Sequence, residues 1–425
     1  MKILVIGGGG REHAIIKKLS ESPRVTKIYA LPGNGGIAAL AELVPGDPKD
    51  LAGAVAFAKS HKIDFCVVAP DDPLVLGMVD EMRKAGIPCF GPDKKAAIIE
   101  GSKAFSKDLM KKYGIPTAGY ETFSVEKTAL EYLKTVDYPI VVKADGLALG
   151  KGVIIAASDE EAAAAVHSMM TEKRFGQSGA KVVIEEFLTG PEVSVLAFTD
   201  GKTLIPMVSS MDHKRALDGD RGLNTGGMGT IAPNPFYTEE IAAVCAERIF
   251  MPTMEAMNKE GRKFKGCLYF GLMLTPEGPK VIEYNCRFGD PETQVVLPLL
   301  ESDLLDIVEA VEEERLADVP VKFRDGAAAC VIMASGGYPG DYPKGLPISF
   351  GRSGEMADVY VYHAGTKPGA DGGLVTSGGR VLGVSAVGDD LGSALRKAYD
   401  AAGEIHFDGA FYRKDIGQRA LKAEK

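Results

Sequence analysis

VIEYNCRFGDPETQ, residues 281–294, decides the fold more than any other stretch of this chain. Glu283 and Asn285 stand two residues apart on a predicted strand, so both side chains project from one face. Two oxygen ligands on one face suit Mg²⁺, which takes few protein ligands and keeps several waters. Arg287 shares that face if the strand continues, and it suits a carboxylate or phosphate. The alternative is a solvated edge strand.

A glycine-rich loop lies upstream in VVKADGLALGKGVII, residues 141–155. Lys143 ends a predicted strand, and a lysine and several glycines follow it. The pattern is not a Walker A loop, because GxxxxGK[ST] needs Ser or Thr where this chain has Gly152. Two strands joined by a glycine loop are typical of a flap whose N–H groups and lysines cover nucleotide phosphates. A plain hairpin with exposed lysines is the alternative.

An acidic strand end follows in VVIEEFLTGPEVSV, residues 182–195. An adenine needs one backbone acceptor and one backbone donor on an exposed strand, and a ribose diol needs a carboxylate nearby. Residues 185–188 and Glu192 could supply all three. By itself this signal is weak, because acidic strand ends are common.

The glycine turn in VIGGGGREHA, residues 5–14, looks at first like a dinucleotide-binding turn. The G-x-G-x-x-G fingerprint fails in both frames, because its third glycine falls at Glu12 or at His13. NAD binding is therefore disfavoured. An anion could still bind at the helix N-terminus, and a tight structural turn is the alternative.

Composition limits the function classes. The chain has 425 residues, 45% of them apolar, which predicts two to four domains. A net charge of −9 argues against nucleic-acid binding. No apolar run approaches about 18 residues, so no membrane span is expected. The six cysteines are scattered without metal spacing, which favours reduced thiols in a cytoplasmic protein.

The order of elements predicts an α/β protein of several domains. Residues 1–100 alternate strands and helices, as in a Rossmann-like parallel sheet. Residues 101–325 hold a lid at about 120–188 and then longer strands, including a hairpin whose second strand carries Glu283. A single helix is expected over 295–313, with a solvated acidic face at 312–314. Residues 326–425 suggest a small α/β cap.

Together these segments resemble the ATP-grasp superfamily and, within it, the glycinamide ribonucleotide synthetase family, the phosphoribosylamine–glycine ligases. The landmarks span nearly the whole chain in family order. RFGDPETQ, and DHKR followed by NTGGMG, are highly specific, whereas GGGG alone is not. The stretches that carry the resemblance are GGGGREHA, PGNGG, EGSKAFSK, VVKADGLALGKGV, EEFLTGPEVS, DHKR, NTGGMG, VIEYNCRFGDPETQ, SGGRVLGV and FYRKDIGQRAL.

The resemblance implies ATP-dependent ligation of glycine to 5-phospho-β-D-ribosylamine in de novo purine (IMP) biosynthesis. The products are glycinamide ribonucleotide, ADP and phosphate, with glycyl phosphate as the intermediate. The cofactors are ATP and Mg²⁺ or Mn²⁺. The partners are the two small-molecule substrates, with no nucleic acid or membrane, and the chain is expected to be a monomer or weak homodimer. Catalysis rests on positioning and charge neutralisation.

The family motifs also imply residue roles. Catalysis is assigned to Arg287, Asp290 and Lys143, and the metal pair to Glu283 and Asn285. Nucleotide binding is assigned to Lys103, Lys143, Gly150, Lys151, Gly152, Glu185, Glu186, Leu188 and Glu192. Substrate binding is assigned to Gly9, Arg11, Glu12, Asn34, Asp71, Asp212, Lys214, Arg287, Gly289 and Asp290, with Lys367 and Arg380 as a clasp for the 5-phosphate.

Two departures from the family pattern bear on these roles. Asp71 stands where the family usually has a glutamate, and the shorter side chain could loosen the sugar site or leave a gap for water. The strand LYFGLMLT opposite the metal pair is apolar where many ATP-grasp enzymes carry an acid. Metal binding is therefore expected to depend on ATP phosphates.

Three rival functions remain open at this point. A formate-dependent transformylase would share the lid and the metal pair but lack RFGDPETQ and DHKR. A nucleotide-responsive binding protein is disfavoured because Lys143, Glu283, Asn285 and Arg287 are all intact. An NAD oxidoreductase is the third. His13 and His213 are either substrate contacts or structural hydrogen-bonders.

Overall fold

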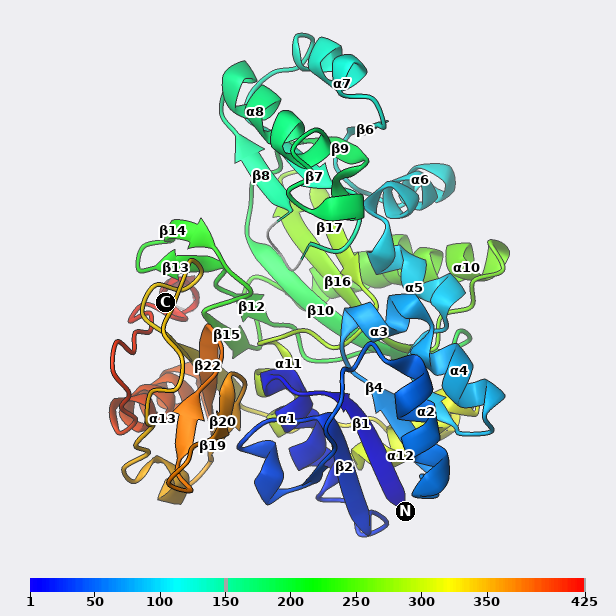
Figure 1. Cartoon of the computed structure of the whole chain (residues 1–425). Coiled ribbons are helices and arrows are strands. Elements are labelled where there is room, and N and C mark those ends of the chain that lie inside the picture. The colour runs from blue at the N-terminus through cyan, green and yellow to red at the C-terminus, as the bar shows by residue number, and fades with distance from the viewer. Residues whose placement is uncertain (149–151, 424–425) are drawn as a thin grey trace.

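In the computed structural model, which describes residues 1–148 and 152–423, the chain begins with a five-stranded parallel sheet (Figure 1). Along the first strand Leu4 and Ile6 join one hydrophobic cluster, whereas Ile3 and Val5 join another. Both faces of the sheet are thus covered, which explains its continuously apolar strands. The sheet order is β3-β2-β1-β4-β5, with β1 at Lys2–Gly7, β2 at Lys27–Pro32, β3 at Glu42–Leu43, β4 at Phe65–Val68 and β5 at Cys89–Phe90.

Helices on the two faces of this sheet supply both clusters. The helices along residues 1–113 are α1 at Gly10–Leu19, α2 at Leu51–Ser60, α3 at Asp71–Leu76, α4 at Met78–Lys84, α5 at Lys94–Gly101 and α6 at Lys103–Tyr113. Ser102 caps α6 by accepting a hydrogen bond from the Phe105 N–H, as Ser commonly does at this position.

The lid is a four-stranded antiparallel sheet at the top of Figure 1. Its order is β6-β9-β7-β8, with β6 at Tyr120–Phe123, β7 at Ile140–Ala144, β8 at Val153–Ala156 and β9 at Val182–Glu186. Helices α7 (Glu126–Leu133) and α8 (Asp159–Met170) pack on it through a hydrophobic cluster of their own. The predicted pair of strands around the glycine loop is confirmed as β7 and β8.

A second four-stranded sheet, β11-β10-β16-β17, forms the centre of the molecule. Its strands are β10 at Glu192–Thr199, β11 at Leu204–Pro206, β16 at Gly266–Thr275 and β17 at Gly278–Asn285. The predicted hairpin is confirmed, because Thr275 pairs with Gly278 across the turn. The segment before β16 contains helix α9 (Glu239–Cys245), a π-helical stretch at Ala246–Phe250 and helix α10 (Met251–Lys259).

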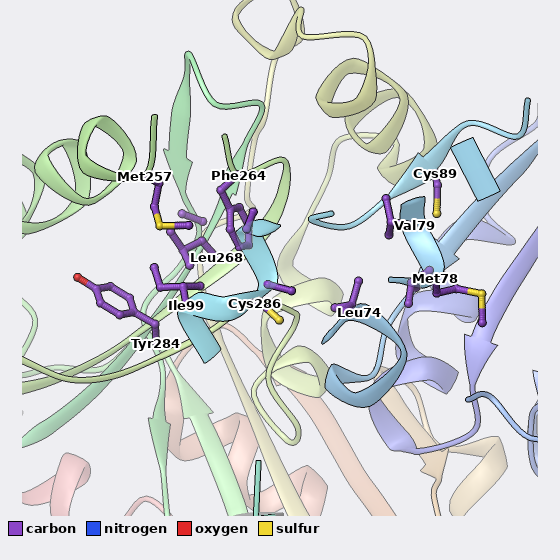
Figure 2. Close-up of a cluster of buried hydrophobic side chains, with 14 of the residues drawn as sticks. Leu74, Met78, Val79, Cys89, Ile99, Met257, Phe264, Leu268, Tyr284 and Cys286 are labelled. Atoms are coloured by element: carbon purple, nitrogen blue, oxygen red, sulfur yellow. The ribbon is translucent and has the colours of Figure 1, made fainter. Parts of the chain in front are cut away.

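The central sheet and the N-terminal sheet share one hydrophobic cluster. Figure 2 shows Leu74 and Met78 of the N-terminal helices in the same cluster as Leu268 of β16, Tyr284 of β17 and Met257 of α10. A close-packed core of this kind resists relative movement of the elements that share it. The N-terminal sheet and the central sheet are therefore held against each other, whereas the lid has a separate core.

The C-terminal sheet has the order β12-β15-β18-β22-β19. Two of its strands, β12 (Met211–Asp212) and β15 (Gly229–Ala232), come from the middle of the chain, so the proposed boundary at 325 stays a prediction. The others are β18 at Ala327–Ala334, β19 at Val359–His363 and β22 at Arg380–Gly388, followed by α13 at Leu391–Gly403 and α14 at Gln418–Ala423. Two small hairpins pair β13 (Arg215–Leu217) with β14 (Arg221–Asn224), and β20 (Thr366–Pro368) with β21 (Leu374–Thr376).

The single helix predicted over 295–313 is wrong. The segment forms α11 (Thr293–Val296), a short 3₁₀ turn containing Pro298, and a separate helix α12 (Leu304–Glu312). A proline lacks the N–H that a continuous helix needs. Asp303 then starts α12 by accepting a hydrogen bond from the Leu305 N–H.

The solvated acidic face expected at 312–314 is also wrong for two of its three residues. Glu312 accepts hydrogen bonds from Arg83 and forms an ion pair with Lys265, and Glu314 pairs with Lys202 and Lys263. These basic residues come from distant parts of the chain, so the local sequence could not reveal them. No helix within the described ranges is long and apolar enough to cross a membrane.

Candidate active site

A single cavity of about 1180 Å³ lies where the lid, the central sheet and parts of the N- and C-terminal sheets meet. It collects most of the residues singled out from the sequence. Gly150 and Lys151, two predicted nucleotide ligands, fall outside the described residues. The predicted residues that line the cavity are Arg11, Asp71, Lys103, Lys143, Gly152, Glu185, Glu186, Leu188, Glu192, Asp212, Lys214, Glu283, Asn285, Arg287, Asp290 and Arg380.

The predicted metal pair lies on β17 at the floor of this cavity. Glu283 pairs with Gly271 of β16, and a Cβ on Gly271 would lie 2.9 Å from the Glu283 Cγ. The glycine opposite therefore gives the carboxylate room to cross the neighbouring strand. Tyr269, opposite Asn285, is the polar residue that this otherwise apolar strand contributes to the cavity wall.

Positive charge surrounds the Glu283 carboxylate. Burial opposes its ionisation, but the ammonium groups of Lys214 and Lys143 lead a set of cations that outweigh burial and lower its pKa. The Lys214 Nζ lies 3.7 Å from Glu283 and 3.2 Å from Glu192. An anionic Glu283 beside several cations is a setting that suits bound phosphates and a divalent cation together.

Two predicted nucleotide lysines are fixed by backbone carbonyl groups. Lys103 donates to the Gly146 carbonyl in the lid loop at 3.0 Å. Lys143 donates to the Ile282 carbonyl at 3.1 Å, next to an irregularity in the β16–β17 register. Burial lowers the pKa of Lys103, with Glu283 opposing the shift. Both ammonium groups are thus held at the cavity before any ligand arrives.

A third buried lysine was missed from the sequence. Lys107 lies one helical turn after Lys103 on α6 and shares Glu185 with Lys143, at 2.9 and 3.0 Å. It also donates to the Thr117 hydroxyl at 2.8 Å. The i, i+4 spacing in SKAFSK is the signal that could have found it, because such residues share one helix face.

Arg287 is oriented by Glu100, another residue missed from the sequence. Its Nη2 lies 2.9 Å from the Glu100 Oε1, while the Cys286 N–H donates to the other carboxylate oxygen at 2.7 Å. The Arg287 Nε is buried and has no hydrogen-bond partner in the part of the chain that the structure describes. The guanidinium is thus held in place with one N–H unused.

The turn after Arg287 is held by the C-terminal sheet. Arg380 donates to the Asp290 and Gly226 carbonyl groups at 2.9 and 2.7 Å, and lies 3.2 Å from the Asp290 carboxylate. Gln294 donates to the other carboxylate oxygen of Asp290 at 2.7 Å. Burial opposes ionisation of Asp290, but Arg380 and other cations lower its pKa. This carboxylate therefore stays ionised and fixed.

Contacts within the protein explain the four opening glycines. A Cβ on Gly8 would lie 2.4 Å from the Gly33 carbonyl oxygen, and one on Gly10 would lie 2.6 Å from the Gln294 Nε2. Gly7 has a φ of +120°, which disfavours other residues. The turn is compressed against PGNGG and the DPETQ segment, and so brings these motifs together.

Several predicted substrate residues use their polar atoms in hydrogen bonds or ion pairs within the protein, in and around this turn. Asn34 donates to the Gly8 and His363 carbonyl groups and accepts from the Gly36 and Ile37 N–H groups. Glu12 accepts from the Gly9 N–H and pairs with Arg11. Gly9, Glu12, Asn34, Gly289 and Lys367 do not line the cavity, and the Lys367 side chain is exposed.

The two histidines left open by the sequence both make hydrogen bonds within the protein, and His213 also lines the cavity. His13 accepts from the His363 N–H at 2.9 Å, which joins α1 to β19. Burial, assisted by His363, lowers the pKa of His13 to about 3, so it is neutral. Both ring nitrogens of His213 bond to backbone groups, one of Gly229 and one of Gly417.

Paired carboxylates form another part of the wall. Burial and the neighbouring Glu292 raise the pKa of Asp212 well above its usual value. Glu292 lies 3.3 Å from the Ser194 hydroxyl, which is 2.8 Å from the Tyr269 hydroxyl. Asp71 also lines the cavity, and its carboxylate accepts from the Asp72 N–H at 3.0 Å. Glu292 was not among the predicted residues.

Models of the phosphoribosylglycinamide synthetase family match nearly the whole chain: the N domain at residues 1–100, the ATP-grasp (A) domain at 101–293 and the C domain at 328–419. The phosphoribosylamine–glycine ligase of Caldanaerobacter subterraneus is 50% identical over 416 residues, covering 98% of this chain and 99% of that protein.

Two solved structures resemble the fold closely. The phosphoribosylamine–glycine ligase of Thermotoga maritima superposes with a TM-score of 0.86 at 34% identity, covering 98% of this chain and all of that one. The biotin carboxylase domain of the Hydrogenobacter thermophilus 2-oxoglutarate carboxylase, solved with MgADP, ADP and bicarbonate, gives a TM-score of 0.75 at 17% identity. It covers 97% of this chain and 91% of that one, and shows likeness of fold alone.

Proposed function

This chain belongs to the phosphoribosylglycinamide synthetase family, and from that premise we propose the reaction and how the cavity performs it. It is an ATP-dependent ligase that joins glycine to 5-phospho-β-D-ribosylamine, yielding glycinamide ribonucleotide, ADP and phosphate in de novo purine biosynthesis. One observation carries the proposal: a single cavity joins a lysine-rich nucleotide half to the Arg287–Asp290 turn.

The nucleotide half binds ATP with a divalent metal ion. We place the phosphates against Lys103 and Lys143, adenine at the 185–188 strand edge, and the ribose at Glu192. Glu283 and Asn285 would hold the metal, because their oxygens share one face of β17 and Glu283 is ionised. The metal supplies charge neutralisation on the phosphates. No group of three His, Cys, Asp or Glu residues able to hold a metal occurs among the described residues, which leaves phosphate oxygens and water as further ligands.

The Arg287–Asp290 turn first activates glycine. Arg287, braced by Glu100, binds the glycine carboxylate near the γ-phosphate. A carboxylate oxygen attacks phosphorus, the bond to the ADP oxygen breaks, and glycyl phosphate forms. The lysines spread along the cavity stabilise the charge on the transferring group, while the lid limits access of water to the acyl phosphate.

The same turn completes the ligation. Asp290, fixed by Arg380 and Gln294, orients the amine of phosphoribosylamine toward the acyl carbon. The C–N bond forms, the C–O bond to phosphate breaks, and the nitrogen loses one proton as phosphate leaves. No side-chain nucleophile is required.

We place the sugar phosphate at the junction of the N- and C-terminal sheets. Arg11 and Asp71 reach the cavity there. The contribution of Gly9, Glu12 and Asn34 would come through the shape of the turn, because their polar groups already have partners. A 5-phosphate clasp by Lys367 and Arg380 stays part of the proposal, with the Lys367 side chain exposed at the surface.

The finer assignments are also proposals. We favour Mg²⁺ with Mn²⁺ as the alternative, a cytoplasmic location, and a monomer or weak homodimer. The location is supported by the six cysteines, all of which are buried and unpaired.

The test is ADP release with Mg-ATP, glycine and phosphoribosylamine generated in situ. We expect release only when both substrates are present, and none when formate or alanine replaces glycine. Release with formate would support the transformylase instead, and ATP binding without release would support a binding protein.

A further inference from the structure

A row of polar side chains crosses the C-terminal sheet on the face that packs against α11. Asp212 of β12 pairs with Thr230 of β15. Thr230 in turn pairs with Cys330 of β18, and Cys330 pairs with Ser385 of β22. The Cβ atoms of directly opposed residues lie about 4.5–5.5 Å apart on one face of a sheet. The row therefore begins at Asp212, which lines the cavity, and continues through the buried interior to Ser385.

The hydroxyl groups of this row are buried without partners. Thr230, Cys330 and Ser385 are all 0% exposed. Neither the Thr230 Oγ1 nor the Ser385 Oγ has a hydrogen-bond partner among residues 1–148 and 152–423. Burial raises the pKa of the Cys330 thiol to about 12, with the nearby Ser385 hydroxyl opposing the shift. A protonated thiol is a weak partner, and no hydrogen bond of normal geometry joins it to that hydroxyl.

Gln294 of α11 presents a third buried polar atom to the same face. Helix α11 lies between the C-terminal sheet and α1 (Figure 1). A Cβ on Gly383 of β22 would lie 3.1 Å from the Cys330 Sγ and 3.8 Å from the Gln294 Cγ, so these side chains meet above the glycine. Ser385 follows Gly383 by two residues and therefore shares its face.

The orientation of the Gln294 amide is set by Asp290. The Asp290 carboxylate is ionised, and only the N–H side of an amide can donate to it. The Gln294 Oε1 therefore faces away from Asp290, and it is buried with no donor in the part of the chain that the structure describes. A buried acceptor without a donor is costly, which favours a further molecule at this position.

The chemistry of these three atoms identifies that molecule. The Gln294 Oε1 is an acceptor, and the Thr230 and Ser385 hydroxyl groups can each donate or accept. None of the three carries a full charge, so the set does not suit an ion. Buried water typically makes about three hydrogen bonds to polar groups that do not reach one another directly. Water is thus the ligand that fits these groups.

We propose that ordered water bound between α11 and the C-terminal sheet joins the Ser385 and Thr230 hydroxyl groups to the Gln294 Oε1, and so keeps the Gln294 N–H on Asp290. Ser385 and Thr230 are positioning residues, because they act on the amine substrate only through Gln294 and the Asp290 carboxylate. The inference rests on the proposed function, since it takes Asp290 to orient the amine of phosphoribosylamine.

A crystal structure of the wild-type chain, at a resolution that shows ordered water, tests the site itself. We expect a water oxygen about 2.5–3.0 Å from the Gln294 Oε1 and from at least one of the two hydroxyl oxygens. Direct hydrogen bonds among these side chains, with no water between them, would overturn the proposal.

Loss of a hydroxyl group should weaken use of the amine and leave ATP binding unchanged. For Ser385→Ala and Thr230→Val we expect KM for phosphoribosylamine to rise by about 3- to 10-fold, with KM for ATP within about twofold. Thr230→Ser keeps the hydroxyl and should keep the wild-type KM. Equal rises in KM for both substrates would overturn the positioning role.

Thr122→Val is the matched control. It removes a hydroxyl group from β6 of the lid that is also buried without a partner in the described part of the chain. We expect KM for phosphoribosylamine to stay at the wild-type value in this variant. A rise as large as in Thr230→Val would overturn the proposal, because it would make the effect a general result of losing a buried hydroxyl.

A double-mutant cycle shows whether Ser385 acts through Gln294. Gln294→Met removes the amide and should raise KM for phosphoribosylamine by more than Ser385→Ala does. In the Gln294→Met chain, Ser385→Ala should then change KM by less than about twofold, because the group through which it acts is already lost. Full additivity of the two changes would overturn the positioning role.

Failure of this inference is distinct from failure of the proposed function. If the wild-type chain ligates glycine normally but binds no water at this position, the reaction stands and the inference falls. If it releases no ADP from ATP with both substrates, the reaction itself falls. Should Ser385→Ala not fold, the wild-type crystal structure and the Thr230→Val and Thr230→Ser pair still decide.

Discussion

The nucleotide end of the cavity and the glycine turn at residues 7–10 use their polar residues in opposite ways. At the nucleotide end, Lys103, Lys143 and Glu185 all line the cavity, and one Glu185 oxygen has no donor among the residues that the structure describes. At the glycine turn, Asn34 and Glu12 bond to the protein itself. A motif can therefore be specific to a family either because its side chains meet the ligand or because they hold together the elements that do.

The largest effect on activity is expected from a substitution at the nucleotide end of the cavity. Glu283→Ala removes the carboxylate that we assign to the metal, and we expect ADP formation to fall by at least about 1000-fold. Folding should change little, because Glu283 is only partly buried and its Gly271 neighbour has no side chain. Wild-type turnover in this variant would overturn the metal assignment. Chelation of divalent ions should reduce ADP formation by the wild-type enzyme as strongly as Glu283→Ala does.

Arg380, which holds the Asp290 carboxylate, gives the next largest effect. Arg380→Ala should raise KM for phosphoribosylamine by roughly 10- to 100-fold, the equivalent of about 1.5–3 kcal/mol for a charge-assisted contact. KM for ATP should change far less, because Arg380 bonds to Asp290 and the Gly226–Gly227 loop. Equal rises in both constants would show that the C-terminal sheet does not serve the amine substrate.

The glycine turn should respond through stability. Asn34→Ala leaves four backbone groups without their partner, and we expect it to lower the free energy of unfolding by about 2–4 kcal/mol. KM for ATP should stay within about threefold at a temperature where the variant is folded. The measurement combines thermal unfolding, for the stability, with steady-state kinetics, for KM. Unchanged stability with a large rise in KM for phosphoribosylamine would instead make Asn34 a direct ligand.

The pH dependence of ATP use gives the smallest effect. Burial lowers the pKa of Lys107 to about 8, although Glu185 favours its charged form and Lys143 opposes it. Raising the pH through 8 should therefore neutralise Lys107 in the free enzyme and lower kcat/KM for ATP. Lys107→Met should lack this decline. A decline of the same size in the variant would assign it to another group.

Local pattern was enough to predict much of the fold. The parallel sheet within residues 1–100, the two strands around the glycine loop and the hairpin that carries Glu283 follow from apolar runs and turn signals. The division of 295–313 into two helices was missed, although Pro298 and Asp303 were visible in the sequence. The ion pairs of Glu312 could not be foreseen, since they join residues more than 200 positions apart in one case.

The candidate site could be predicted where a single motif contains the functional residue types at a characteristic spacing. Glu283, Asn285, Arg287 and Asp290 come from a single stretch and meet at the cavity. Glu100 and Lys107 were missed because they act through Arg287 and Glu185, and only the tertiary structure joins them. The opening glycines were identified as unusual, but their cause, close approach of Gly33 and Gln294, needed coordinates.

The central claim is that one cavity first phosphorylates glycine and then passes the glycyl group to the amine. Glycine labelled with ¹⁸O in its carboxylate tests it directly, with the released phosphate examined by mass spectrometry. The proposed mechanism requires one ¹⁸O atom in each phosphate released, because the attacking carboxylate oxygen leaves with phosphorus. Unlabelled phosphate, released in step with glycinamide ribonucleotide, would contradict it.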